Sequence, residues 1–312
     1  MMHGGIGEDG TLQSLLQDAE IPYTGPGFLA SRTCIDKMSS SLALEHLTTF
    51  GILTIPKEVW SIQKILNMSI STIWNDLTRN LQCKTLCVKP ARDGCSSGVA
   101  KLCSTDDLRL YVKALKECLL QIPANSLSKV HGVIEMPNPP PNSFIFESFI
   151  DTDEIIVPSN SASGKTGHLI WKGNSQWVEV TVGVIGRRGD MHSLTPSITV
   201  KETGDILSLE EKFQGGTGIN LTPPPVTIIS EKVLQKCKER IEMIANTLEL
   251  EGFSRIDVFV NVHTGEVLVI EVNTVPGMTP STVLIQQALA EEPAMYPHDF
   301  FRAVLDLALQ RS

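Results

Sequence analysis

One segment near the C-terminus, residues 252–279, constrains the fold of this chain more than any other. It runs GFSRIDVFVNVHTGEVLVIEVNTVPGMT, with two apolar runs rich in β-branched residues on either side of a turn at residues 263–265. Such a pattern predicts a β-hairpin. A carboxylate interrupts each run, at Asp257 and at Glu271. The hairpin therefore carries acidic side chains on strands that otherwise resemble core strands.

The spacing of these polar residues predicts a metal site. Glu271 and Asn273 share parity, so both side chains leave the same face of their strand. A connecting loop with an odd number of residues places Asp257 opposite Glu271 on that face, and Arg255 shares parity with Asp257. Mg²⁺ prefers carboxylates and other hard oxygens, together with nucleotide phosphates. The alternative is that these side chains are solvated positions on an exposed strand face.

Length and composition limit the classes of fold and function. A chain of 312 residues can bury a sizeable core and allows two or three domains. The net charge of −9 argues against a general nucleic-acid surface, and no apolar run approaches the roughly 18–20 residues of a membrane span. Seven cysteines lack the paired spacing of a zinc site, and their odd number fits a reducing compartment.

Apolar periodicity predicts most of the remaining elements. A helical pattern starts near Ser31 and continues to Leu47, and within it Lys37, taken alone, is an ordinary surface lysine. Further segments are predicted as helices over 106–120, 230–250 and 300–309, as strands over 144–150 and 179–185, and as loops over 123–143, 158–176 and 203–225.

Several segments outside the hairpin are candidates for binding. Residues 84–102 predict a strand, a small flexible loop and a second strand, with Lys89 at the end of the first; such a turn can approach phosphates or be only a turn. Glu147 ends an apolar strand, where it can accept from a nucleotide or face water. His3 and Glu8 flank a glycine-rich turn before a helix, which suits an anionic substrate group or is a disordered terminus.

Taken together, these motifs resemble the D-alanine–D-alanine ligases from residue 3 to the C-terminus. The resemblance rests on HGGIGEDGTLQSLLQDAEIPYTGPGFLAS with the following Asp36-Lys37, on VKPARDGCSSGVAKL, on residues 179–186, and on RIDVFVN with IEVNTVPGMT. It implies an α+β chain with the ATP-grasp fold, in which two α+β lobes clamp ATP. The implied parts are a remnant of the N-terminal α/β lobe at 1–36, a small lobe at 37–145 and a C-terminal lobe at 146–312.

The same resemblance implies an activity. It is that of an ATP-dependent ligase that joins two D-alanines through an acyl-phosphate, for peptidoglycan precursor synthesis. The implied ligands are ATP, D-alanine and Mg²⁺ (or Mn²⁺), with two metal ions. We expect no binding of nucleic acid and no insertion into a membrane. We expect a homodimer or a tandem partner domain. We expect a cytoplasmic protein, or a plastid one if it comes from a plant and lacks its transit peptide.

The resemblance also implies a role for individual residues. The metal ligands would be Asp257, Glu271 and Asn273, while Arg255 and Gly277 would stabilise the transferring phosphate and the tetrahedral intermediate. ATP would be bound by Lys37, Lys89, Glu147, Ser148, Ile150, Glu179 and Lys212, with Glu154 as a rival to Glu179 at the ribose. His3 and Glu8 would lie by the first D-alanine, and Ser281 or Thr282 by the carboxylate of the second.

Three departures from the family pattern leave alternatives open. The N-terminal strand, loop and helix are absent, so we expect a truncated or alternatively started form. Cys95 stands at the family's loop serine, which leaves Ser96 as the neighbouring catalytic candidate, and Phe213 stands at the lid tyrosine, whose hydrogen bond it cannot donate. The alternatives are a non-catalytic ATP-binding remnant or half of a tandem ligase, and a ligase with a different amine or hydroxy-acid acceptor.

Overall fold

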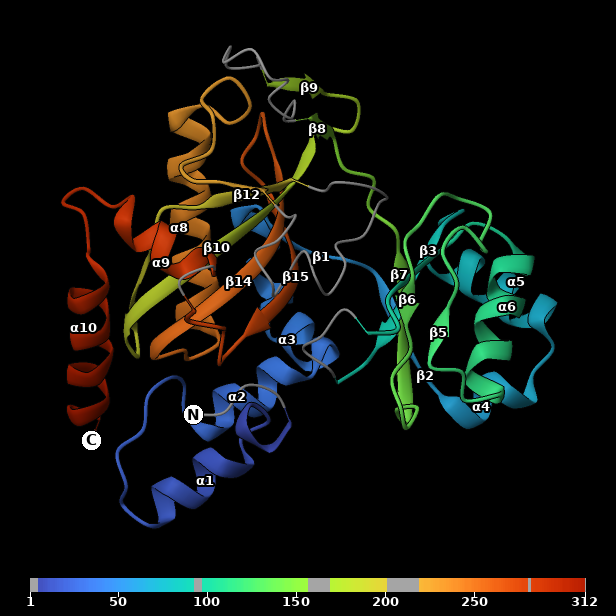
Figure 1. Cartoon of the computed structure of the whole chain (residues 1–312), viewed down its shortest axis with the longest axis horizontal. Helices are drawn as coiled ribbons and strands as arrows, with labels where there is room; N and C mark the ends of the chain where they lie inside the picture. Colours follow the sequence, from blue (N-terminus) through green and yellow to red (C-terminus); the bar gives the residue numbers. More distant parts are fainter. Residues whose placement is uncertain (1–4, 93–96, 157–168, 201–218, 280–281, 312) are drawn as a thin grey trace, which may run out of the picture. The chain divides into compact units, whose positions relative to one another are not determined.

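The chain forms two compact units in a computed structural model, which describes residues 5–92, 97–156, 169–200, 219–279 and 282–311. The larger unit comprises the described residues within 1–54, 152–202 and 217–312, and the smaller unit those within 55–151. Each unit contains its own sheet and its own helices (Figure 1). The predicted combination of helix and sheet is thus confirmed, and the predicted three-part division stays a prediction.

The larger unit is built on a sheet with the strand order β1-β15-β14-β10-β12-β13, and β11 also pairs with β10. β1 pairs with β15 in parallel, and the other neighbours pair antiparallel. A separate ladder joins β8 to β9. The strands are β1 (Ile52–Thr54), β8 (Glu154–Ile156), β9 (Ile170–Lys172), β10 (Trp177–Arg187), β11 (Asp190–Ser193), β12 (Ser197–Val200), β13 (Ile219–Leu221), β14 (Gly252–Asn261) and β15 (Val267–Asn273).

Helices with apolar faces pack against this sheet. α8 (Glu231–Thr247) buries Val233, Cys237 and Ile241, which recur at helical spacing and join the valines of the central strands in one core. α9 (Val283–Leu289) and α10 (Pro297–Leu309) form a second cluster, in which Phe253 and Phe300 meet edge to face. None of the described helices is long and apolar enough to cross a membrane.

The predicted hairpin is confirmed. β14 and β15 pair antiparallel, with Asp257 opposite Glu271 and Arg255 opposite Asn273. The register shifts between Asp257 and Val258, so a bulge follows the acidic pair. The pair Val260–Val267 encloses six residues, an even number, so the bulge and not the turn brings Asp257 opposite Glu271.

The single helix predicted to start near Ser31 is wrong. The structure has α1 (Thr11–Asp18), α2 (Phe28–Ile35), α3 (Lys37–Leu44) and two 3₁₀ segments (Gly5–Gly7 and Glu45–Phe50). Asp36 separates α2 from α3 because its backbone is extended and its carboxylate accepts the N–H groups of Met38 and Ser39. Lys37 is therefore the first residue of α3, and this cap fixes its position.

The smaller unit is a sheet with the order β2-β7-β3-β4 packed against helices. The two predicted strands are confirmed as β3 (Leu86–Pro90) and β4 (Ala100–Leu102), and Lys89 lies near the end of β3. The predicted loop between them lies partly outside the described residues. The other elements are β2 (Lys57–Ser61), β5 (Gln121–Ile122), β6 (Ile134–Glu135), β7 (Ser143–Ser148), α4 (Ile62–Asn67), α5 (Ile70–Asn80) and α6 (Thr105–Lys116).

Candidate functional site

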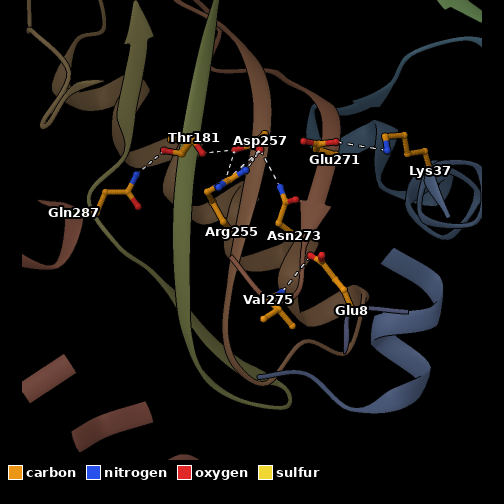
Figure 2. A network of polar contacts seen from close by, with 9 residues as sticks. All are labelled: Glu8, Lys37, Thr181, Arg255, Asp257, Glu271, Asn273, Val275 and Gln287. Carbon is orange, nitrogen blue, oxygen red and sulfur yellow. Dashed lines mark hydrogen bonds and ion pairs between the residues drawn. The ribbon is translucent and has the colours of Figure 1, made fainter. Parts of the chain in front are cut away.

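Asp257 is the centre of a polar network on the hairpin (Figure 2). Arg255 Nε lies 3.1 Å from its Oδ1 and Arg255 Nη2 lies 2.9 Å from its Oδ2. The Asn273 amide donates to Oδ2 at 3.0 Å, and the Thr181 hydroxyl donates to Oδ1. Asp257 is only 7 % exposed. The alternative of a solvated strand face is therefore excluded for these side chains.

Lys37 and Glu271 form an ion pair at the edge of this network. Lys37 Nζ lies 3.6 Å from Glu271 Oε2, and the two side chains are 7 % and 11 % exposed. The description of Lys37 as an ordinary surface lysine is therefore wrong. The cap at Asp36 explains the difference, because it begins a new helix at Lys37 and directs that residue toward β15 (Figure 2).

The surrounding carboxylates keep Arg255 charged. Burial by itself lowers the pKa of Arg255, but its ion pair and hydrogen bonds with Asp257, and the charges of Glu271 and Glu8, raise the pKa above its ordinary value. A buried guanidinium with a two-pronged partner holds a fixed orientation. The site thus contains a permanent, oriented cation beside its acidic residues.

The donor set of the hairpin fits a divalent cation. Asp257, Glu271 and Asn273 supply two carboxylates and an amide oxygen, which are the hard ligands that Mg²⁺ and Ca²⁺ take. No cluster of three or more His, Cys, Asp or Glu side chains suited to a metal occurs among the described residues, and an amide is needed to complete this set. Asp257 already accepts from three side chains, so a cation bound there exchanges with at least one of them.

The segment after Asn273 brings the N-terminal turn to the same edge. Glu8 Oε1 accepts from the Val275 N–H at 3.4 Å, and the Glu8 carbonyl accepts from the Thr274 hydroxyl at 3.4 Å. Glu8 is buried. Thr282 lies against Gly277, because a Cβ added at Gly277 would be 3.2 Å from Thr282 Cγ2. The structure therefore brings Glu8 to the hairpin end and Thr282 to Gly277.

The smaller unit contains its own buried charge cluster. Glu147 Oε1 lies 2.6 Å from Lys89 Nζ, and Glu147 Oε2 lies 3.7 Å from Lys57 Nζ. The three side chains are almost fully buried. The alternative that Glu147 faces water is therefore excluded. Lys57 was missed by sequence reasoning, although a lysine opposite Glu147 follows from pairing β2 with β7.

The other predicted ATP residues lie in more ordinary settings. Ser148 donates to the Leu81 carbonyl at 3.3 Å, and Ile150 follows the end of β7. Glu179 is half-buried on β10 opposite Phe259. Its rival Glu154 is exposed and pairs with Lys172 at 2.7 Å. Five predicted positions lie outside the described residues, namely His3, Cys95, Ser96, Lys212 and Ser281, and so does Phe213.

Two further members of the network were not singled out from the sequence. Thr181 lies within the segment 179–186, but nothing in its spacing shows that its hydroxyl meets Asp257. Gln287 donates to the Thr181 carbonyl at 2.7 Å from α9, a helix that was not predicted. A polar residue in an otherwise apolar stretch, VLIQQAL, was the available signal for Gln287.

Comparisons with known proteins identify relatives of this chain. The family profile described as D-ala D-ala ligase C-terminus matches residues 159–298. The D-alanine–D-alanine ligase of Carboxydothermus hydrogenoformans is 26 % identical over 309 residues, covering 99 % of this chain and 80 % of the relative. The enzyme of that name from Leptospira interrogans is 28 % identical over 316 residues, covering 100 % and 72 %.

A solved structure of a protein with the same name is also similar to this chain. The D-alanine–D-alanine ligase of Bacillus anthracis, complexed with ATP, superposes with a TM-score of 0.63 at 19 % identity, covering 99 % of this chain and 76 % of that one. At 19 % sequence identity, this structural similarity establishes the fold of the chain. The predicted α+β ATP-grasp fold is therefore confirmed.

Proposed function

The chain belongs to the D-alanine–D-alanine ligase family, and we propose that it is an ATP-dependent ligase that joins two D-alanines through an acyl-phosphate in peptidoglycan precursor synthesis. The observation that carries this proposal is the buried hairpin network. Asp257, Glu271 and Asn273 lie beside two buried cations, Arg255 and Lys37. Such a set combines metal ligands with charges that bind phosphate.

The cofactors follow from the family and from the donor set. ATP and a divalent metal are common to ligases of this kind, and we assign the metal to Asp257, Glu271 and Asn273. Two Mg²⁺ or Mn²⁺ ions suit these oxygen ligands. A bound metal would neutralise charge on the phosphates of ATP. Thr181 and Arg255 hold the Asp257 carboxylate in place for this role.

The first chemical step is phosphoryl transfer. A carboxylate oxygen of one D-alanine attacks the γ-phosphorus of ATP, the bond from that phosphorus to the bridging oxygen breaks, and ADP leaves. Arg255 and Lys37 stabilise the charge on the transferring phosphoryl oxygens. Both cations are buried, where electrostatic interactions are stronger than in water.

The second step forms the peptide bond. The ammonium group of the second D-alanine first loses one proton to solvent, and the resulting amine attacks the carbonyl carbon of the acyl-phosphate. The tetrahedral intermediate breaks its bond to the phosphate oxygen, and inorganic phosphate leaves with the second proton of the attacking nitrogen. Arg255 and the backbone at Gly277 stabilise this intermediate. Glu8, with His3, orients the first D-alanine, and Thr282 or Ser281 binds the carboxylate of the second. The contact of Glu8 with Val275, and of Thr282 with Gly277, supports this assignment.

Further assignments complete the proposal. In the smaller unit, Lys89 binds ATP phosphates, while Glu147, Ser148 and Ile150 line the adenine pocket. Glu179 binds ribose, Lys212 binds ATP, and Cys95 and Ser96 belong to the catalytic loop. We also propose a homodimer or a tandem partner domain, and a cytoplasmic location, with a plastid as the alternative.

Phosphate release tests the proposal directly. The purified chain is incubated with ATP, Mg²⁺ and D-alanine, phosphate release is followed, and the dipeptide is identified by mass spectrometry. We expect release that depends on all three components. Asp257→Asn should abolish it, whereas the matched change Asp190→Asn, at an exposed position of β11, should leave it unchanged. ATP binding without phosphate release at any D-alanine concentration would refute the ligase and favour the non-catalytic alternative.

A further inference from the structure

The outer edge of β10 has a gap beside the hairpin network. β14 pairs along one edge of β10, and β11 and β12 share the other. β12 pairs with β10 as far as Thr181, and β11 pairs with it from Val184 onward. In the registers of the described strands, residues 182–183 thus have no strand partner on this edge. A buried strand edge needs other hydrogen-bonding groups at such a gap.

The side chain of Gln287 fills this gap, and Figure 2 shows its contact with Thr181. Its Nε2 donates to the Thr181 carbonyl at 2.7 Å and its Oε1 accepts from the Gly183 N–H at 2.7 Å. The remaining hydrogen of Nε2 goes to Ser197 Oγ at 3.0 Å. Gln287 has 0 % exposure. The side-chain amide therefore hydrogen-bonds to β10 as the backbone of a neighbouring strand would, with Nε2 as the donor and Oε1 as the acceptor.

The two residues that Gln287 braces lie opposite the proposed catalytic pair. Thr181 faces Asp257 across β10 and β14, and Gly183 faces Arg255. The Thr181 hydroxyl also donates to Asp257. The Thr181 carbonyl points toward Gln287, so Thr181 and Asp257 form a non-hydrogen-bonded pair, whose side chains approach more closely.

Gly183 allows this brace to form. A Cβ at residue 183 would lie 2.5 Å from Leu284 Cδ2 and 2.9 Å from Gln287 Oε1. Only a glycine lets α9 approach the strand this closely. The far end of α9 is held separately, because the Thr195 hydroxyl donates to the Ala290 carbonyl at 3.2 Å.

The other end of α9 belongs to the proposed acceptor site. Thr282 is the N-cap residue of α9, and it lies against Gly277. A ring of contacts therefore runs from Asp257 through Thr181 and Gln287 to α9, and from Thr282 and Gly277 back along the chain to Asn273, which bonds Asp257. A shift of α9 moves Thr282 relative to Asp257.

We propose that Gln287 is a positioning residue that sets the affinity for the acceptor D-alanine by holding α9 against the strand opposite Asp257 and Arg255. This inference rests on the proposed function. Gln287 touches neither substrate nor metal ligand; it acts through Thr181, Gly183 and the N-terminal end of α9. A merely structural glutamine would affect stability alone, so the test needs a readout that separates the two roles.

Gln287→Met is the main variant, because methionine keeps the length of the side chain and removes its three hydrogen bonds. Gln287→Glu is the second variant and retains an acceptor for the Gly183 N–H. Asn246→Leu on α8 is the matched control, because Asn246 Oδ1 also accepts from a strand N–H, that of Met191 at 3.1 Å, away from Asp257.

The measurements are the D-alanine concentration for half-maximal phosphate release, the dissociation constants of ATP and of D-alanyl-D-alanine, and the exchange rate of the Gly183 amide. We expect Gln287→Met to raise the D-alanine requirement and the dipeptide dissociation constant about tenfold, with ATP affinity within about twofold. Gly183 exchange should accelerate in Gln287→Met and less in Gln287→Glu. Asn246→Leu should lower thermal stability and leave the D-alanine requirement unchanged.

The outcomes separate the two proposals. If the wild-type chain neither releases phosphate nor binds the dipeptide, the proposed function fails and the inference fails with it. If the wild-type chain does either, and a folded Gln287 variant has unchanged D-alanine and dipeptide affinities, the inference alone is refuted. If Gln287→Met does not fold, Gln287→Glu decides, because unchanged affinities together with faster Gly183 exchange would also refute it.

Discussion

Arg255 and Asp257 lie two residues apart on β14 and are joined by a two-pronged ion pair, with Nε 3.1 Å from Oδ1 and Nη2 2.9 Å from Oδ2. Lysine at residue 255 keeps the charge and loses the planar fork. We expect Arg255→Lys to slow D-alanine-dependent phosphate release by about 10²–10³, the loss typical of one group that stabilises a transition state. Steady-state kinetics measure the change.

A matched substitution separates this effect from a general loss of arginine. Arg187→Lys alters an exposed arginine at the end of β10 and should leave phosphate release within about twofold. Since Arg255 remains charged at every accessible pH, its own titration should not appear in the pH profile of release. An Arg255→Lys enzyme with wild-type turnover would contradict the assignment.

Glu147 should be essential to the stability of the smaller unit. Glu147→Gln removes the buried negative charge that both Lys57 and Lys89 contact. Breaking a buried ion pair by removing one of its partners costs about 3–5 kcal/mol. We expect the free energy of unfolding of the smaller unit to decrease by that amount. Hydrogen exchange of the amides in this unit, measured at increasing urea concentrations, gives this free energy.

An exposed ion pair in the same unit provides the comparison. Asp76→Asn breaks the pair with Arg79, 2.6 Å apart on the surface of α5, and should cost about 0–1 kcal/mol. Equal losses for the two variants would show that burial does not determine the energy of the Glu147 cluster.

The hairpin was predictable from sequence because strand parity is a strict geometric rule. Side chains alternate along a strand, so Arg255 shares a face with Asp257, and Glu271 shares one with Asn273. The pairing of Asp257 with Glu271 was less predictable, because the pair Val260–Val267 encloses an even number of residues and a bulge shifts the register after it. Lys89 was placed correctly, since the apolar run of β3 ends just after it. Two of the motifs that carry the family resemblance, RIDVFVN and IEVNTVPGMT, lie in the hairpin and the segment that follows it.

The rest of the network depends on contacts between segments far apart in the chain. Thr181 meets Asp257 only because β10 pairs with β14 in one register, and Gln287 reaches Thr181 only because Gly183 admits α9. Neither contact leaves a periodic signal in the sequence. The break before Lys37 was missed because helical periodicity continues across Asp36, while the decisive feature is a capping side chain.

Two buried thiols should make the larger unit less stable at alkaline pH. Burial raises the pKa of Cys34 and of Cys237 from 9.0 to about 12. Below pH 9 the folded and unfolded states hold these protons equally. Between pH 9 and 12 the unfolded state releases them and the folded state does not, so stability falls as pH rises, by up to about 1.36 kcal/mol per pH unit for each thiol.

Urea denaturation in reducing buffer between pH 8 and pH 11 measures this slope. The double variant Cys34→Ala, Cys237→Ala should be less stable at pH 8, because it leaves small cavities, and should lose stability less steeply above pH 9. The exposed Cys118 provides a contrast: Cys118→Ala should keep the wild-type slope. An unchanged slope in the double variant would show that these thiols do not govern the alkaline transition.

We expect Arg311 to stabilise the packing of the described C-terminal end against the segment that precedes α2. Its guanidinium lies 3.9 Å from the centre of the Tyr23 ring, 3.5 Å from Glu251 Oε1, and donates to the Gly25 carbonyl. Gly25 in turn packs against Gly252, the first residue of β14, where an added Cβ would lie 2.9 Å from the Gly25 nitrogen. Arg311 therefore holds a tight crossing next to the strand that carries Arg255 and Asp257.

Arg311 makes both favourable and unfavourable contributions to the free energy of unfolding. The cation–π contact and the ion pair stabilise the fold, while Arg311 Nε and Nη1 are buried without a hydrogen-bond partner and offset part of that gain. We expect Arg311→Leu to lower the free energy of unfolding by about 1–2 kcal/mol. Arg302→Leu, at an exposed position on α10, should stay within about 0.5 kcal/mol. Thermal denaturation measures both, and equal melting temperatures for wild type and Arg311→Leu would show that the crossing holds without this side chain.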